Sequence, residues 1–260
     1  MSIRRKTIAE ARFPKIPEFQ ELANVWGSDA SLLILSFVWR GYDLLRQDVL
    51  DHVDASEVDE DLERSVTQLL EPRVRRSMTG DEPFDVQHGP YEHETRQPPP
   101  AQPPEYDLAF VLRANPRVMW PLEAKLVRTP GGVARYVQEI TDNFLTCRYA
   151  PFSREGAMLG YVLSADTSSV FGNIARSVPC ELEGVLDFAD RAHRTSHHTR
   201  AVPAGKAYPQ SFTCHHLLML LNDSSAGSRR SKVSAGKGKK REKAAQRPKP
   251  IPLPKSCQAP

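Results

Sequence analysis

Two apolar segments decide how this chain folds: Tyr106-Asp107-Leu108-Ala109-Phe110-Val111-Leu112 and Trp120-Pro121-Leu122-Glu123-Ala124-Lys125-Leu126-Val127. Both are typical of buried β-strands. Because side chains alternate along a strand, Glu123 and Lys125 share one face, opposite the aliphatic residues around them. Charged groups in a buried sheet cost free energy unless they are paired, bound to a metal or used in function. These charges, together with Asp107 at the start of the first run, therefore mark a candidate functional site.

Helical and strand-like patterns alternate along the rest of the chain. Helices are expected over residues 29–50, 57–78, 133–145, 167–178 and 181–194, and further strands over residues 84–88, 157–163 and 211–221. Strands interleaved with helices predict an α/β fold with a mixed central sheet flanked by helices.

One domain is expected over residues 1–223, with an N-terminal helical extension over about residues 1–56 and a disordered basic tail over residues 224–260. The tail holds 11 Lys and Arg and one acidic residue, a net charge of +10. Since the whole chain carries +3, the rest carries −7. The tail either attracts nucleic acid or only solubilises the chain. The acidic body lacks the basic charge typical of a duplex-binding surface.

Cysteine spacing and hydropathy predict a cytoplasmic protein. The four cysteines are widely separated and form no C-x-x-C motif, a pattern typical of free thiols in a reducing compartment. The longest apolar run, residues 31–39, is only nine residues long and is too short to span a membrane. The N-terminus has no apolar stretch of the kind found in a signal peptide.

The charged residues of the two segments suit phosphodiester hydrolysis. Asp107 and Glu123 offer carboxylate oxygens, which Mg²⁺ or Mn²⁺ prefers, and the carbonyl of Ala124 lies between Glu123 and Lys125. Lys125 could orient or deprotonate the attacking water, or stabilise charge on the phosphate. Residues 1–223 contain only four lysines against 20 arginines, so a lysine in an apolar strand suggests a need for an ammonium group. The alternative is an exposed edge strand, which Pro121 would suit.

An acid on one strand, followed about 16 residues later by Glu-x-Lys on the next, resembles the PD-(D/E)xK nuclease superfamily over roughly residues 57–165. The proline of the family's motif is not adjacent to Asp107 but lies shortly before it, at Pro103 and Pro104. The resemblance implies a restriction-endonuclease-like fold. It also implies a metal ion held by Asp107, Glu123 and the Ala124 carbonyl, with Lys125 as a catalytic residue.

The resemblance further implies a catalytic glutamate on the preceding helix. We expect Glu63, with Glu60 one turn earlier as the alternative. Related nucleases often place a Gln or Tyr on the helix after the Glu-x-Lys strand. Arg135, Tyr136 and Gln138 are therefore candidates for nucleic-acid contact, although Tyr136 fits the core stripe equally well.

Two polar stretches have open roles. Residues 84–96, which include His88, could line the substrate cleft. Residues 191–200, rich in Arg and His, either contact phosphates or form a solvated loop. His216 lies on an apolar strand and is expected to be a hydrogen-bonded core residue.

These observations predict a metal-dependent nuclease, a hydrolase acting on DNA with Mg²⁺ or Mn²⁺ as cofactor, in bacterial restriction, repair or anti-phage defence. The expected partners are nucleic acid and a protein partner or a second copy of the chain, with no membrane. The alternative is a catalytically inactive nucleic-acid-binding or scaffold subunit of a larger complex, to which the helix over residues 29–50 could dock another protein.

Overall fold

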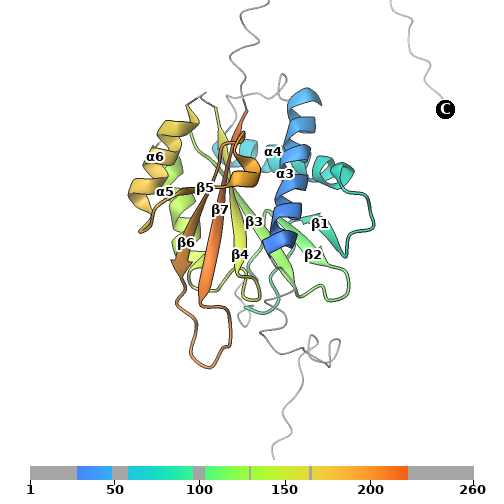
Figure 1. Ribbon diagram of the computed structural model, residues 1–260, viewed down its shortest axis with the longest axis vertical. Coiled ribbons are helices and arrows are strands. Elements are labelled where there is room, and N and C mark those ends of the chain that lie inside the picture. The colour runs from blue at the N-terminus through green and yellow to red at the C-terminus, as the bar shows by residue number, and fades with distance from the viewer. Residues whose placement is uncertain (1–27, 49–57, 96–102, 129, 164–165, 222–260) are drawn as a thin grey trace, which may run out of the picture. The chain divides into compact units, whose positions relative to one another are not determined.

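The structure is a computed structural model that describes residues 28–48, 58–95, 103–128, 130–163 and 166–221 (Figure 1). The chain before residue 28, most of the Pro-rich segment around residue 100 and the tail expected over residues 224–260 lie outside the described residues. Within the described ranges, no helix combines the length and apolar character that crossing a bilayer requires.

Helices α3 (Ser28–Asp48) and α4 (Asp59–Ser77) precede the strands β1 (Phe84–His88), β2 (Leu108–Leu112) and β3 (Met119–Leu126). Helix α5 (Pro130–Glu139) continues into a π-helical turn (Ile140–Phe144), followed by β4 (Glu155–Val162) and α6 (Thr167–Ser177). The last elements are β5 (Glu183–Gly184), a 3₁₀ helix (Leu186–Phe188), β6 (His193–Thr199) and β7 (Ser211–Leu220). The expected elements are confirmed within a few residues, except for the helix over 181–194.

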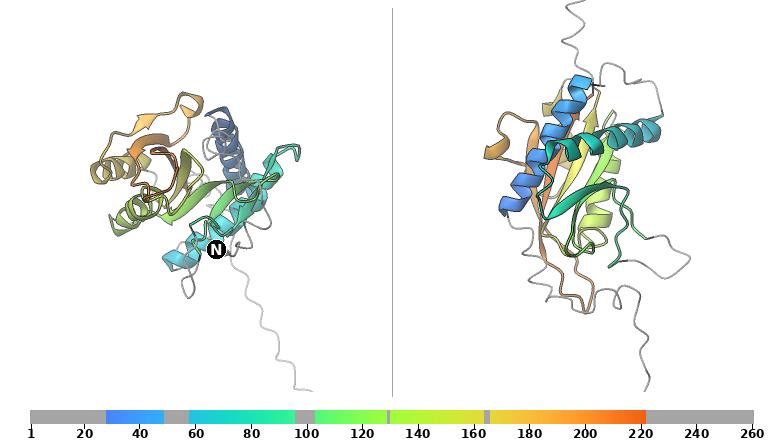
Figure 2. Two further views of the ribbon diagram at one scale, coloured as in Figure 1. Left: turned by 90° about the horizontal axis from the view of Figure 1, so that it is seen from below. Right: turned by 90° about the vertical axis from the view of Figure 1, so that its right-hand side faces the viewer.

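The seven strands form one mixed sheet in the order β1-β2-β3-β4-β7-β6-β5. Helices α3 and α4 cover one face and α5 and α6 the other, as Figure 2 shows. The predicted α/β fold with a flanked mixed sheet is therefore confirmed. Strand β3 pairs antiparallel with β2 and parallel with β4, so the edge-strand alternative is wrong. Pro121 is tolerated because the pairing with β4 begins only at Leu122.

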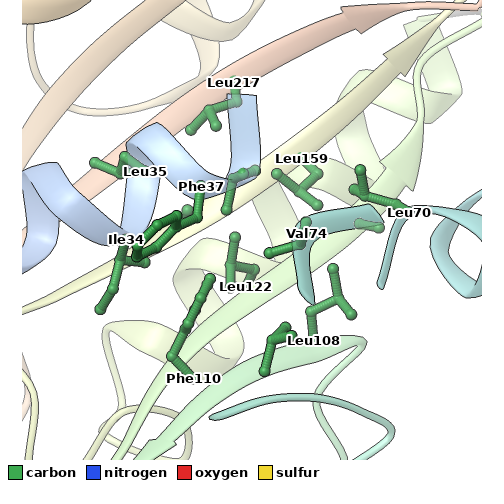
Figure 3. Close-up of a cluster of buried hydrophobic side chains, with 14 of the residues drawn as sticks. Ile34, Leu35, Phe37, Leu70, Val74, Leu108, Phe110, Leu122, Leu159 and Leu217 are labelled. Carbon is green, nitrogen blue, oxygen red and sulfur yellow. The ribbon is translucent and has the colours of Figure 1, made fainter. Parts of the chain in front are cut away.

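Alternation along β3 divides its side chains between the two layers. Leu122, Ala124 and Leu126 pack into a fully buried cluster with residues of α3 and α4, such as Ile34 and Leu70 (Figure 3). Glu123 and Lys125 therefore point away from this cluster, as the sequence predicts. The second core lies under α5 and α6.

The prediction of a helix over residues 181–194 is wrong, because this range contains β5, a short 3₁₀ helix and the start of β6. Residues 191–200, for which phosphate contacts or a solvated loop were predicted, contain strand β6. The sequence of β6 shows no alternation of apolar and polar residues, because its buried side chains are polar. Ser196 is fully buried and hydrogen-bonds to Nε2 of both His198 and His216, at 2.7 Å each. His216 is a core residue, as expected, and its Nδ1 lies 2.9 Å from the Tyr136 hydroxyl. The three described cysteines are free thiols.

Helices α3 and α4 cross in close contact at Gly41. A Cβ atom there would lie 2.7 Å from the backbone nitrogen of Val74 and 2.8 Å from its Cα. We expect Gly41→Ala to lower the free energy of unfolding by about 1–3 kcal/mol, because backbone atoms cannot move aside cheaply. The matched control is Gly172→Ala in α6, which meets no atom within 4 Å and should be neutral or stabilising by about 0.5–1 kcal/mol. Urea unfolding measures both, and equal effects would contradict the tight crossing.

The buried histidines make folding stability depend on pH. Burial lowers the pKa of His193 to about 2 and that of His216 to about 3, from an ordinary value of 6.5. The unfolded chain binds these protons below about pH 6.5 and the folded chain does not, so both groups cost stability as pH falls. Replacing His216 with Gln should remove about 1–2 kcal/mol of the difference in unfolding free energy between about pH 7.5 and pH 5. Denaturant titrations at both pH values test this, and a variant with the wild-type difference would refute it.

Candidate active site

Five charged side chains meet at one end of strand β3, around the ammonium of Lys125. Its Nζ lies 3.4 Å from Glu63 Oε1 and 3.5 Å from Glu139 Oε1. It also lies 4.0 Å from Asp107 Oδ2 and 4.0 Å from Glu123 Oε2. We call Glu63, Asp107, Glu123 and Glu139 the carboxylate cluster. The structure therefore brings together Asp107, Glu123, Lys125 and Glu63, which the sequence singles out, and adds Glu139.

Backbone groups of β3 hold the cluster in place. The N–H of Ala124 donates to Asp107 Oδ2 at 2.7 Å, and the N–H of Leu126 donates to Glu63 Oε2 at 2.8 Å. Asp107 lies just before β2, whose first residue pairs with Leu122, so the antiparallel register puts it next to Glu123. The two strands and helix α4 are thus tied together by the carboxylates themselves.

Glu139 reaches the cluster because the chain turns back sharply after β3. A Cβ atom on Gly132 would lie 2.6 Å from the carbonyl oxygen of Leu126, so only glycine permits this close return. Glu139 is the last residue of α5 and accepts a hydrogen bond from Asn143 in the π-helical turn. Sequence reasoning missed Glu139, and the only signal for it was the Gly131-Gly132 pair that allows the turn.

Burial and repulsion shift the pKa values of the cluster. Burial, followed by the negative charge of Asp107, raises the pKa of Glu123 well above its ordinary range. Burial also raises the pKa of Glu63, although Lys125 partly opposes this. Burial alone would lower the pKa of Lys125, but the four carboxylates outweigh it and raise that pKa. With a single ammonium among four carboxylates, the cluster lacks positive charge.

The donor set fits a divalent cation at Asp107 and Glu123. Glu123 is only 3% exposed, yet its Oε1 has no hydrogen-bond partner among the residues that the structure describes. A buried carboxylate oxygen without a partner costs free energy that a cation would recover. In the described part of the chain, no three His, Cys, Asp or Glu side chains are arranged to hold one metal ion. Mg²⁺ needs only one or two carboxylates, with water and substrate completing its shell. The Ala124 carbonyl, predicted as a further ligand, accepts a hydrogen bond from Lys125 Nζ at 2.8 Å.

The other predicted residues lie outside the cluster. Glu60 has a side chain that is 77% exposed and pairs with Arg135, so Glu63 is the glutamate that α4 contributes. Arg135 also pairs with Asp59 at 3.2 Å. Tyr136 is fully buried and cannot contact nucleic acid, because its ring packs in the core against His216. Gln138 is bonded to Asp142 on the exposed side of α5.

A cavity of about 340 Å³ adjoins the cluster. Glu63 and Asp107 form part of its wall, so cluster and cavity are continuous. Of the stretch over residues 84–96, His88 and Gly89 line this cavity. Glu92 is instead buried, and it accepts a hydrogen bond from the Tyr106 hydroxyl at 2.7 Å.

Comparison of the chain with protein-family models, with curated proteins and with solved structures gave no match in any of the three.

Two glutamates should respond oppositely to the same substitution. Glu123 has a raised pKa, so its burial as a carboxylate lowers stability increasingly above about pH 4.5. For Glu155, burial raises the pKa, but hydrogen bonds with His215 and Ser31 outweigh it and the net pKa is lowered. Without metal at about pH 8, we expect Glu123→Gln to raise the free energy of unfolding by about 1–2 kcal/mol and Glu155→Gln to lower it by about 1–2 kcal/mol.

Urea unfolding in EDTA measures both changes. The gain for Glu123→Gln should shrink towards pH 5, where the unfolded carboxylate also takes up a proton. A lower free energy of unfolding for Glu123→Gln in EDTA would contradict the prediction, because it would show that other groups already compensate the buried negative charge.

Proposed function

We propose that this protein is a metal-dependent nuclease that hydrolyses phosphodiester bonds in DNA and that its sheet is restriction-endonuclease-like. The observation that carries the proposal is the convergence of Asp107, directly before β2, with Glu123 and Lys125 of the adjacent strand β3. The order of α4, β1, β2, β3, α5 and β4 supports it, because the acid lies directly before β2 and the Glu-x-Lys motif lies on the neighbouring strand β3 of a mixed sheet.

In this proposal Asp107 and Glu123 hold a Mg²⁺ or Mn²⁺ ion. The ion, when bound, supplies an activated water and neutralises charge on the phosphate oxygens. Glu63 and Glu139 are the nearest carboxylates to Lys125 and keep its ammonium at the site. Because the cluster raises its pKa, Lys125 keeps its proton and donates to a phosphate oxygen, and does not serve as a base.

The second candidate is a catalytically inactive nucleic-acid-binding or scaffold subunit. The net charge of −7 on residues 1–223 favours it, because a duplex-binding surface is usually basic. The two candidates differ in one respect that can be measured, which is strand cleavage in the presence of a divalent ion.

Cleavage of plasmid DNA and labelled oligonucleotides, with Mg²⁺, Mn²⁺ or EDTA, tests the proposal. We expect cleavage with either ion and none in EDTA. Lys125→Ala, Glu123→Gln and Asp107→Asn should each lower kcat by roughly 10²-fold or more, because Lys125 stabilises charge on the phosphate and the two carboxylates hold the ion. The matched control is Glu183→Gln on β5, an exposed carboxylate outside the cluster, which should leave the rate unchanged.

Robust cleavage by folded Glu123→Gln protein would refute the proposal. Metal-independent DNA binding without turnover by the wild type would favour the inactive subunit.

A further inference from the structure

We propose that the cavity beside the carboxylate cluster is a subsite for one unpaired nucleotide of a single strand, with Arg64 and His88 binding its phosphate. The proposal rests on the proposed function, because it assigns the scissile phosphate to the cluster and the neighbouring nucleotide to the cavity. The chemistry it names is that of a phosphodiester strand, shared by DNA and RNA.

The cavity has the position and size of a substrate subsite. It is bounded by the first turns of α4, the end of β1 and residues 105–107, and it shares Glu63 and Asp107 with the cluster. A strand whose phosphate lies at the cluster therefore has its next nucleotide at the cavity. The volume of about 340 Å³ lies at the lower end of the range for small-molecule pockets, which suits one such unit.

Arg64 and His88 are available to bind an anion. Both are exposed at the cavity, and neither side chain makes a hydrogen bond or ion pair with any residue that the structure describes. Nearby arginines are neutralised, since Arg128 and Arg135 both pair with Asp59. An unpaired guanidinium beside several carboxylates is available for a phosphate, to which it can donate two parallel hydrogen bonds.

The wall of the cavity favours an unpaired nucleotide over a duplex. Gly89 has a left-handed backbone (φ +65), and a Cβ atom on it would lie 2.9 Å from Glu105 Oε1. Glycine therefore allows the backbone to pass near the Glu105 carboxylate, and both residues line the cavity. A base that remains paired and stacked cannot enter so small a space. An unpaired nucleotide enters without the free-energy cost of unpairing.

The test measures binding and does not require cleavage. The full-length protein is titrated with labelled single-stranded DNA, single-stranded RNA and a DNA duplex of the same sequence, in Ca²⁺, over a series of salt concentrations. Gels confirm that the strands stay intact. The variants are Arg64→Gln and His88→Gln, with Arg154→Gln as the matched control. Arg154 is also exposed, and its side chain makes no hydrogen bond or ion pair with the described residues, but it lies directly before β4, at the end of that strand away from the cluster.

We expect the wild type to bind a single strand more tightly than the duplex. Arg64→Gln and His88→Gln should raise Kd for the single strand roughly 5- to 10-fold. Arg64→Gln should also reduce the slope of log K against log salt by about 0.7, the contribution of one phosphate contact on a single strand. Arg154→Gln should bind as the wild type does. The DNA and RNA arms show which strand is preferred.

Equal Kd values of Arg64→Gln and Arg154→Gln for the single strand would overturn the subsite. So would an equal loss of affinity for duplex and single strand in Arg64→Gln. A wild type that binds no single strand would overturn it as well. If the subsite fails while the wild type still cleaves DNA, the proposed hydrolysis stands. If binding depends on Arg64 but no divalent ion supports cleavage, the subsite stands and the hydrolysis fails.

Discussion

The ammonium of Lys125 lies among four carboxylates, and this imbalance of charge is the constraint on which the site depends. One cation cannot compensate Glu63, Asp107, Glu123 and Glu139 together, so burial and repulsion raise the pKa of Glu123 and Glu63. Unpaired buried charge is strongly unfavourable, so a cluster of this kind lowers the stability of the fold unless another charge compensates it. A further cation would therefore relieve the excess negative charge of the cluster.

The same interactions connect the cluster to the scaffold. Asp107 and Glu63 each accept a hydrogen bond from the backbone of β3, so the carboxylates also join β2, β3 and α4. Backbone donors fix these oxygens more firmly than flexible side chains would, because β3 is a central strand with a partner on each side. Preorganised oxygens of this kind bind metal ions and polarise substrates without rearrangement.

The sequence predicted those parts of the structure that periodicity encodes. Alternation along β3 separated Glu123 and Lys125 from the aliphatic core, and the register of β2 then placed Asp107 beside them. The missed parts depend on contacts between distant residues. Strand β6 buries Ser196 and His193, whose polarity resembles a loop until partners such as His216 satisfy it. Glu139 lies on a polar helix face, and only the tight turn at Gly132 brings it to Lys125. Helical position alone could not show that Tyr136 faces the core.

The most direct test of the cation site is the position of bound Mn²⁺ in crystals of the protein, located by its anomalous scattering. The account predicts one peak between the carboxylates of Asp107 and Glu123, with Glu123 Oε1 among its ligands. A peak elsewhere, or none in crystals grown with saturating Mn²⁺ and an ordered cluster, would contradict it.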